Sequence, residues 1–184
     1  MSDRVLILGD PLLRTKSEAV TNFSSDETRR VFRELKDELE DFRKEHGFGR
    51  GIAAIQIGIT KRIIALNLGE GSFCIVNPEI THKSEKTFTL WDDCMSFPDL
   101  VVKVSRNESI SVGYLDEDGN ERTWKDLGRD VSELLQHEID HLDGILALDR
   151  AIAAGDIIYT KEYLERRKLY DAQADYSIEP TIAR

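Results

Sequence analysis

A short segment late in the chain holds the residues best suited to bind a metal ion. Residues 137–141 read His-Glu-Ile-Asp-His, and the whole chain of 184 residues has only four histidines. Side chains four residues apart project from one face of a helix, so His137 and His141 can bind the same divalent ion. Glu138 can then reach a water at that ion without being a ligand, which suits a general base. This spacing predicts a hydrolytic metal site on a helix, against the plainer alternative of a surface helix with two histidines.

Such a site needs a third protein ligand, because catalytic zinc-type sites usually have three ligands and one open position. The candidates are a carboxylate, Cys94, His46 and His82. Cys94 is attractive because a thiolate is a strong, soft ligand and because this cysteine lies in a polar turn sequence. From chemistry alone, a small buried side chain is an equally good interpretation of Cys94. Cys74 lies inside an apolar run and is expected to pack in the core.

The composition is that of an ordinary soluble globular protein, with 40% apolar and 33% charged residues. The length of 184 residues predicts a single domain over residues 1–176, followed by a disordered tail over residues 177–184. No run approaches the ~18 apolar residues of a membrane span, and the N-terminus lacks a secretory apolar region, so we expect no membrane partner and a cytoplasmic location. That location argues against a disulfide between the two cysteines. The net charge of −10 argues against nucleic acid, which needs clustered Lys and Arg.

Helical and extended elements must position the metal motif. Residues 5–8 predict a short extended segment that runs into a turn. Residues 26–46 predict a long helix, with N-cap candidates at Ser24 and Ser25 and a stop at Gly47. Its buried face is predicted by apolar residues at three- and four-residue steps, namely Val31, Phe32, Leu35, Leu39 and Phe42.

The middle of the chain predicts strands, and the C-terminal part predicts helices. We expect strands over residues 62–68, 73–76, 86–91, 100–104, 109–115 and 122–124. Pro78 is expected to end the second of these strands, and a hairpin loop is expected near Gly119. The helix with the metal motif is expected over residues 129–142, closed by Gly144, and a last amphipathic helix over residues 160–174. This layout indicates an α+β fold in which antiparallel strands wrap around one central metal-binding helix. The sequence does not predict an oligomeric state.

Three motifs, in this order, resemble those of the peptide deformylase family. Residues 49–56, Gly-Arg-Gly-Ile-Ala-Ala-Ile-Gln, resemble its Gly-apolar-Gly-apolar-Ala-Ala-x-Gln motif. Residues 92–96, Asp-Asp-Cys-Met-Ser, occupy the place of Glu-Gly-Cys-Leu-Ser. Residues 136–144 match Gln-His-Glu-x-Asp-His-Leu-x-Gly closely. Order and spacing agree over residues 4–150, so the resemblance implies a peptide deformylase-like fold.

The resemblance implies a role for each site residue. One divalent ion, Fe²⁺ in the cell and replaceable by Zn²⁺, Ni²⁺ or Co²⁺, would be held by Cys94, His137 and His141. Glu138 would move a proton from the attacking water to the leaving amine. Gln56 and the backbone N–H of Met95 would stabilise the oxyanion, as donors placed for charge that develops in the transition state. Gly51 would contact substrate through its backbone, since a side chain there would block the approach.

The pocket for the substrate side chain departs from the family pattern. Family members line the methionine pocket with apolar side chains, but the position between the two glycines of the first motif is Arg50 here. Counting back along the helix from His137, the pocket positions fall on Asp130, Glu133 and Leu134, so two of the three are acids. Either Arg50 pairs with one of these acids and closes the pocket, or the site receives a polar or charged side chain, because burying such charges unpaired is costly. A helix phase shifted by one residue would instead turn these side chains toward solvent.

Two further departures lie near the cysteine motif. Asp92-Asp93 replaces Glu-Gly, which adds a side chain and a charge beside the thiolate, and Asp92 can pair with Arg106. A substrate-contacting Arg of many family members is absent, and Val101 occupies about that place. The intact ligands and Glu138 predict a metal-dependent hydrolase that removes the N-formyl group from peptides or related formylated amines. The altered pocket predicts weak or shifted activity on formyl-Met peptides.

Two alternatives stay open. The first is a deformylase-fold protein that binds metal or a peptide without turnover, because the departures cluster on the substrate side. Retention of Gln56 and Glu138 speaks against it. The second is a His-Glu-x-x-His peptidase, whose third ligand would come from a later residue such as Asp149 or Glu162, since both other histidines lie upstream.

Overall fold

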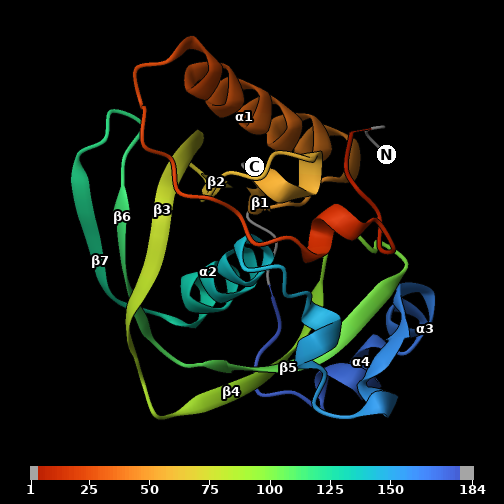
Figure 1. The fold of residues 1–184 in the computed structure, drawn as a ribbon. Coiled ribbons are helices and arrows are strands. Elements are labelled where there is room, and N and C mark those ends of the chain that lie inside the picture. The colour runs from red at the N-terminus through yellow and green to blue at the C-terminus, as the bar shows by residue number, and fades with distance from the viewer. Residues whose placement is uncertain (1–3, 179–184) are drawn as a thin grey trace.

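The computed structural model describes residues 4–178 and has a helix at its centre with antiparallel strands around it (Figure 1). The larger sheet has five strands in the order β1 (Gly51–Ala53), β2 (Ile63–Asn67), β3 (Ser72–Lys83), β6 (Ile110–Leu115) and β7 (Glu121–Leu127). The smaller sheet has three strands in the order β4 (Thr87–Asp93), β5 (Leu100–Asn107) and β8 (Ile157–Tyr159). The central helix, α2 (Arg129–Leu142), packs against β1 and β2 of the larger sheet and β5 of the smaller. The α+β architecture predicted from the sequence is confirmed.

Further helices complete the fold. The long helix α1 (Asp26–His46) covers the larger sheet on the side away from α2 (Figure 1). Within residues 4–178, the connections contain the 3-10 helices η1 (Pro11–Arg14), η2 (Ala54–Ile57), η3 (Ala147–Arg150) and η4 (Ala154–Asp156). Two short helices, α3 (Thr160–Glu165) and α4 (Arg167–Asp171), lie near the C-terminus.

Helix α1 has the bounds that its sequence predicts. Ser25 is the N-cap and its side chain accepts a hydrogen bond from the Thr28 amide at 3.1 Å. Gly47 ends the helix in the left-handed conformation, with φ of 74°, which only glycine adopts without strain. The five apolar residues of the predicted stripe are all buried and form the core between α1 and the larger sheet.

The prediction that Pro78 ends a strand is wrong. Strand β3 continues through Pro78 to Lys83, with a shift of register against β6 between Val76 and Glu79. Asn77 has a positive φ of 49° at this irregularity. A proline is compatible with a strand at such a bulge because no ladder hydrogen bond from its nitrogen is required there.

The smaller sheet differs from the prediction at two places. Strand β4 extends to Asp93, so Asp92 and Asp93 lie in a strand that pairs with Val101 and Val102 and not in a turn. Strand β8, over residues 157–159, was not predicted, because three residues are too few to show the alternation of apolar and polar residues that marks a strand. Residues 5–8, predicted as extended, form no strand, but the Leu6 and Leu8 amides donate to carbonyls of Gln56 and Ser96.

The last predicted helix, over residues 160–174, is broken into α3 and α4 at Arg166. Seven residues of continuous helix would separate Tyr163 and Tyr170 by about 10 Å along the axis. Their ring centroids are 6.1 Å apart, and both rings pack on Trp91. The break therefore lets two aromatic rings share one partner.

The last described residues lie beside the smaller sheet. Ile178 packs against the core cluster around β4 and β5, together with Tyr176. Most of the predicted disordered tail, residues 179–184, lies outside the described residues. Across residues 4–178, none of the helices combines the length and the apolar character needed to cross a bilayer.

Candidate active site

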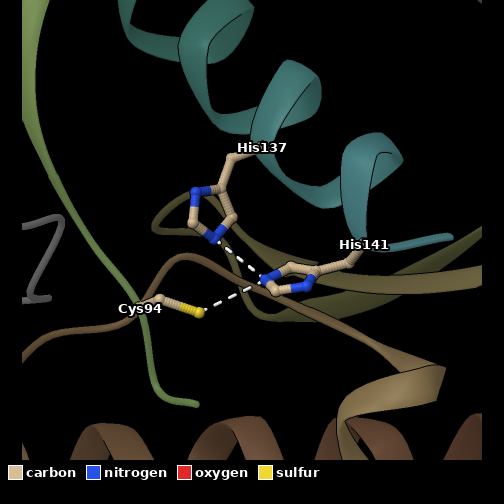
Figure 2. A group of neighbouring side chains, drawn as sticks. All are labelled: Cys94, His137 and His141. Atoms are coloured by element: carbon tan, nitrogen blue, oxygen red, sulfur yellow. Dashed lines mark hydrogen bonds between the residues drawn. The ribbon is translucent and has the colours of Figure 1, made fainter. Parts of the chain in front are cut away.

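Three potential metal ligands meet beside α2. Cys94 Sγ lies 3.2 Å from His141 Nε2, which lies 3.1 Å from His137 Nε2 (Figure 2). The three donor atoms lie within 4.8 Å of one another, and all three residues are buried. Both histidines come from α2, whereas Cys94 follows directly after β4. The structure thus brings Cys94, and neither His46 nor His82, to the helical pair among the described residues.

The donor set has the chemistry that a divalent ion requires. Two imidazole nitrogens and one thiol sulfur match a three-ligand site with an open fourth position. Asp92 Oδ2 lies 2.9 Å from His137 Nδ1, and a carboxylate in this place fixes the ring so that Nε2 faces the other donor atoms. Burial raises the pKa of the Cys94 thiol, and a coordinated cation would oppose that effect by favouring the thiolate. The residues present therefore fit a metal centre.

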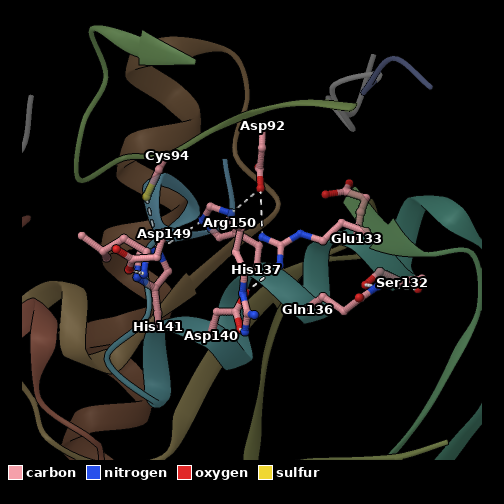
Figure 3. A network of polar contacts seen from close by, with 12 residues as sticks. Asp92, Cys94, Ser132, Glu133, Gln136, His137, Asp140, His141, Asp149 and Arg150 are labelled. Atoms are coloured by element: carbon pink, nitrogen blue, oxygen red, sulfur yellow. Dashed lines mark hydrogen bonds and ion pairs between the residues drawn. The ribbon is translucent and has the colours of Figure 1, made fainter. Parts of the chain in front are cut away.

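A buried charge network holds Asp92 in place. Arg106 donates to Asp92 Oδ2 at 3.1 Å and to Asp140 Oδ2 at 2.6 Å. Arg150 also pairs with Asp140 (Figure 3). Burial alone would raise the pKa of Asp92, but His137 and Arg106 outweigh burial and lower this pKa to about 2. The pairing of Asp92 with Arg106 that the sequence suggested is present. It links β4, β5 and α2 behind the ligands.

Replacing Asp92 with Asn should lower the free energy of unfolding by about 3 kcal/mol, because removing one partner of a buried ion pair leaves the other uncompensated. Urea unfolding of the metal-free protein measures this change. Asp118→Asn is the control, since Asp118 is an exposed acid in the β6–β7 loop. A loss below about 1 kcal/mol for Asp92→Asn would mean that Asp140 alone satisfies Arg106.

Gln136 anchors α2 to β5, a role that sequence reasoning missed. Its Oε1 accepts from the Asn107 amide at 3.0 Å, and its Nε2 donates to the Asn107 carbonyl at 3.1 Å. Ser132, one turn earlier, donates to the same carbonyl at 2.8 Å. Gln136 therefore fixes the position of α2 relative to β5, the strand that carries Arg106. The only sequence signal was its place in the motif.

Glu138 and Gly51 are in close contact. Glu138 is buried, and burial raises the pKa of its carboxyl to about 7. Its Oε2 has no hydrogen-bond partner within residues 4–178. A Cβ on Gly51 would lie 2.8 Å from Glu138 Oε1, closer than real Cβ contacts allow. Gly51 is therefore required to leave room for Glu138, a reason additional to the predicted approach of substrate.

Replacing Gly51 with Ala should lower kcat by about 10²-fold, because displacing a reacting group by about 1 Å can cost that much. The new methyl group must push the Glu138 carboxylate away from its position. Gly155→Ala is the matched control, since no atom lies within 4 Å of a Cβ there. Steady-state rates of both variants test the contact, and parental activity of Gly51→Ala would show that Glu138 relaxes freely.

The two predicted oxyanion donors flank Cys94. Gln56 is buried, and its Oε1 accepts from the Ala53 amide at 2.9 Å, which turns the Nε2 side of the amide toward Cys94 Sγ at 3.6 Å. Nε2 also lies 3.3 Å from Ser96 Oγ. Met95 follows Cys94, and both Met95 and Gln56 line the active-site cavity. Gln56 and Met95 therefore both lie at the site.

The active-site cavity has a volume of about 300 Å³ and contains the predicted pocket residues with one exception. Arg50 forms an ion pair with Glu133, and its other guanidinium nitrogen donates to the Asp130 carbonyl at 2.8 Å. The side chains of Arg50 and Glu133 are 10% and 2% exposed, so the pair is withdrawn from water. Burial raises the pKa of Glu133 to about 7, against the opposing effect of Arg50. The Asp130 side chain is exposed and does not line the cavity, so this residue reaches the site only through its backbone.

One wall of the cavity was not anticipated. It comes from the C-terminal segment and includes Thr160, Tyr163, Leu164, Arg167 and Ile178. Thr160 fixes this segment by donating to the Pro98 carbonyl at 2.9 Å and, through its amide, to the Asp99 carbonyl at 2.8 Å. The amphipathic pattern of residues 160–174 indicated packing onto the body but not onto the site. Val101, at the place of the absent Arg, also lines the cavity.

The site combines a His-Glu-x-x-His motif on a helix, a thiol from a distant segment, and the buried carboxylate of the glutamate in that motif. These features define the class of metal-dependent hydrolases. The sequence profile of the family described as polypeptide deformylase matches residues 2–155. A peptide deformylase of Thermotoga maritima is 33% identical over 168 residues, which cover 91% of this chain and 94% of that protein. The chain belongs to the polypeptide deformylase family, which confirms the prediction from the three motifs.

Solved structures of peptide deformylases share the fold. The crystal structure of the Thermotoga maritima peptide deformylase has a TM-score of 0.73 at 31% identity and covers 82% of this chain and 97% of that chain. A peptide deformylase from Synechococcus elongatus, in complex with actinonin, has a TM-score of 0.75 at 28% identity and covers 98% and 93%. The family profile ends at residue 155, before β8, so the C-terminal wall of the cavity lies beyond the profile match.

Proposed function

We propose that this protein removes the N-formyl group from peptides or related formylated amines by metal-assisted hydrolysis in the cytoplasm. The observation that carries the proposal is the convergence of Cys94, His137 and His141 beside the buried carboxylate of Glu138. Membership of the polypeptide deformylase family supports it. We propose Fe²⁺ as the ion in the cell, with Zn²⁺, Ni²⁺ or Co²⁺ as substitutes on the same ligands. Held by Cys94, His137 and His141, such an ion would polarise the formyl carbonyl and lower the pKa of water.

Glu138 carries the proton through the reaction. Its carboxylate accepts a proton from the water whose oxygen attacks the formyl carbon, and then gives this proton to the amine nitrogen as the C–N bond breaks. The products are formate and the free amine. A carboxyl whose pKa lies near 7 can both accept and release a proton at neutral pH, and the buried position of Glu138 supports this role.

The oxyanion of the tetrahedral state is stabilised by two donors, Gln56 Nε2 and the Met95 N–H. The hydrogen bond from Ala53 to Gln56 Oε1 supports this assignment, because it orients the donor end of the amide before substrate arrives. Loss of one such donor typically costs about 10²–10³ in rate. Gly51 contributes its backbone to the substrate and leaves the space that Glu138 needs.

The preferred substrate differs from formyl-Met peptides. A buried ion pair of Arg50 with Glu133 supports this, because an apolar thioether cannot satisfy charged groups and gains nothing beside them. A polar or charged side chain can hydrogen-bond to the same groups. Both residues line the cavity together with the metal ligands Cys94 and His137, so the pair is within reach of a bound peptide.

Formate release from a panel of N-formyl peptides tests the proposal. The protein loaded with Fe²⁺ or Ni²⁺ is incubated with peptides that differ only in the first side chain, and formate is measured. Release of formate that depends on metal is expected, with formyl-Met not the best substrate. The absence of formate with every peptide, despite bound metal, would favour a deformylase-fold protein that binds without turnover. Clear selectivity for formyl-Met over charged side chains would contradict the substrate preference.

A further inference from the structure

The active-site cavity opens to solvent between apolar side chains. Two of its lining residues, Phe48 and Leu164, are large apolar side chains that are exposed to water. Cys94 and His137 line the same cavity but are buried. The cavity therefore runs from the buried donor atoms to the protein surface, and Phe48 and Leu164 lie at its mouth. Single exposed apolar side chains are common on proteins, but a pair at the mouth of an active-site cavity points to a ligand.

The fold holds both apolar residues in place. Phe48 follows α1 and packs edge-on against Phe42, with ring centroids 5.4 Å apart at 89°. Leu164 lies on α3, whose first residue, Thr160, donates to the Pro98 carbonyl at 2.9 Å. A ligand would therefore meet an apolar surface whose position is set before binding, which lowers the entropic cost of binding.

The other residues near the mouth leave its apolar surface as the basis of selection. Val101 extends this surface, since it lines the cavity on β5, the strand that pairs with β8 just before α3. Asp93 and Arg167 also line the cavity and are exposed, but their charges are of opposite sign and together favour neither sign in a ligand. Leu164 lies beyond the family profile match, so this part of the mouth belongs to the segment that follows the match.

We propose that the cavity mouth selects formylated peptides with apolar side chains on the two residues that follow the formylated residue, and that Leu164 determines this selectivity. The inference rests on the proposed deformylase function. With the formyl group beside Cys94 and His137, the peptide leaves through the mouth, and its next two residues span about 7 Å. Apolar side chains there lose contact with water against Leu164 and Phe48, whereas polar side chains of the same size lose hydrogen bonds to water.

Equilibrium binding tests the selectivity separately from turnover. The metal-loaded Glu138→Gln variant is titrated by calorimetry with the C-terminal amides of formyl-Gln-Leu-Leu and formyl-Gln-Asn-Asn, because leucine and asparagine side chains have nearly the same shape. We expect the leucine peptide to bind about tenfold tighter, and the added Leu164→Ser change to reduce this ratio below about threefold. Leu164→Met, which keeps an apolar side chain, should retain the ratio.

Leu169→Ser is the matched control. Leu169 on α4 is 55% exposed, close to the 61% of Leu164, but it does not line the cavity. This variant should keep the parental ratio. Equal binding of the two peptides by the parent, or tighter binding of the asparagine peptide, overturns the selectivity. An unchanged ratio in Leu164→Ser, or an equal loss in Leu169→Ser, overturns the role of Leu164.

Formate release by the parent protein, measured on the same two peptides, separates this inference from the proposed function. A binding preference without formate release from either peptide would contradict the proposed function and leave the selectivity standing. Formate release from both peptides at equal kcat/KM, together with equal binding, would support the function and overturn the selectivity.

Discussion

Replacing Glu138 with glutamine should lower kcat for formate release by about 10²–10⁴-fold, the range typical for loss of a general acid–base group. Glutamine keeps the size of the side chain but cannot accept the proton from water. The variant should bind the parental amount of metal, because Glu138 is not among the three clustered ligands. Rates on a formylated peptide and the metal content per chain are measured on the same preparation.

The local structure makes Glu138→Gln a clean test. Glu138 is 4% exposed and its Oε2 lacks a hydrogen-bond partner among the described residues, so burial disfavours its charge and raises the pKa of its carboxyl to about 7. Removing its charge should therefore not lower the free energy of unfolding. Glu121→Gln, at the exposed start of β7, is the control for the change of net charge. Parental turnover of Glu138→Gln would exclude the proposed proton transfer.

The parts of the site that lie on one helix were predictable from spacing. His137 and His141 share a face of α2 because they are four residues apart, and the same counting placed Glu133 in the cavity. Pairing of Arg50 with Glu133 or Asp130 was one of two predicted alternatives, and in the structure Arg50 forms an ion pair with Glu133. The same count also put the Asp130 side chain at the pocket, whereas the structure leaves it exposed at the first turn of the helix.

The third potential ligand was not predictable from the residues themselves. Cys94 and His141 are 47 positions apart, and their contact depends on how β4 and α2 pack, which no local pattern encodes. Only the resemblance to a family implied it. The C-terminal wall was missed for a related reason, since an amphipathic pattern shows that Tyr163 packs inward but not which surface it meets.

Replacing Cys94 with alanine should lower the affinity for the divalent ion by more than about 100-fold, which exceeds the 10–100-fold cost of removing a partner of a ligand. The remaining pair, His137 and His141, supplies only two nitrogen donors. Formate release should fall in proportion to the metal lost. Metal per chain after dialysis against a buffered ion, measured by elemental analysis, gives the result.

Cys74→Ala is the matched control, because Cys74 is equally buried but lies in the core beneath α1, with its Sγ 3.8 Å from the Phe32 carbonyl. This variant should keep the parental metal content. Full retention of metal by Cys94→Ala would favour a peptidase whose third ligand comes from a later residue. The structure argues against that result, since Asp149 accepts from the Leu146 amide and pairs with Arg14, and neither Asp149 nor Glu162 belongs to the cluster of ligand atoms among the described residues.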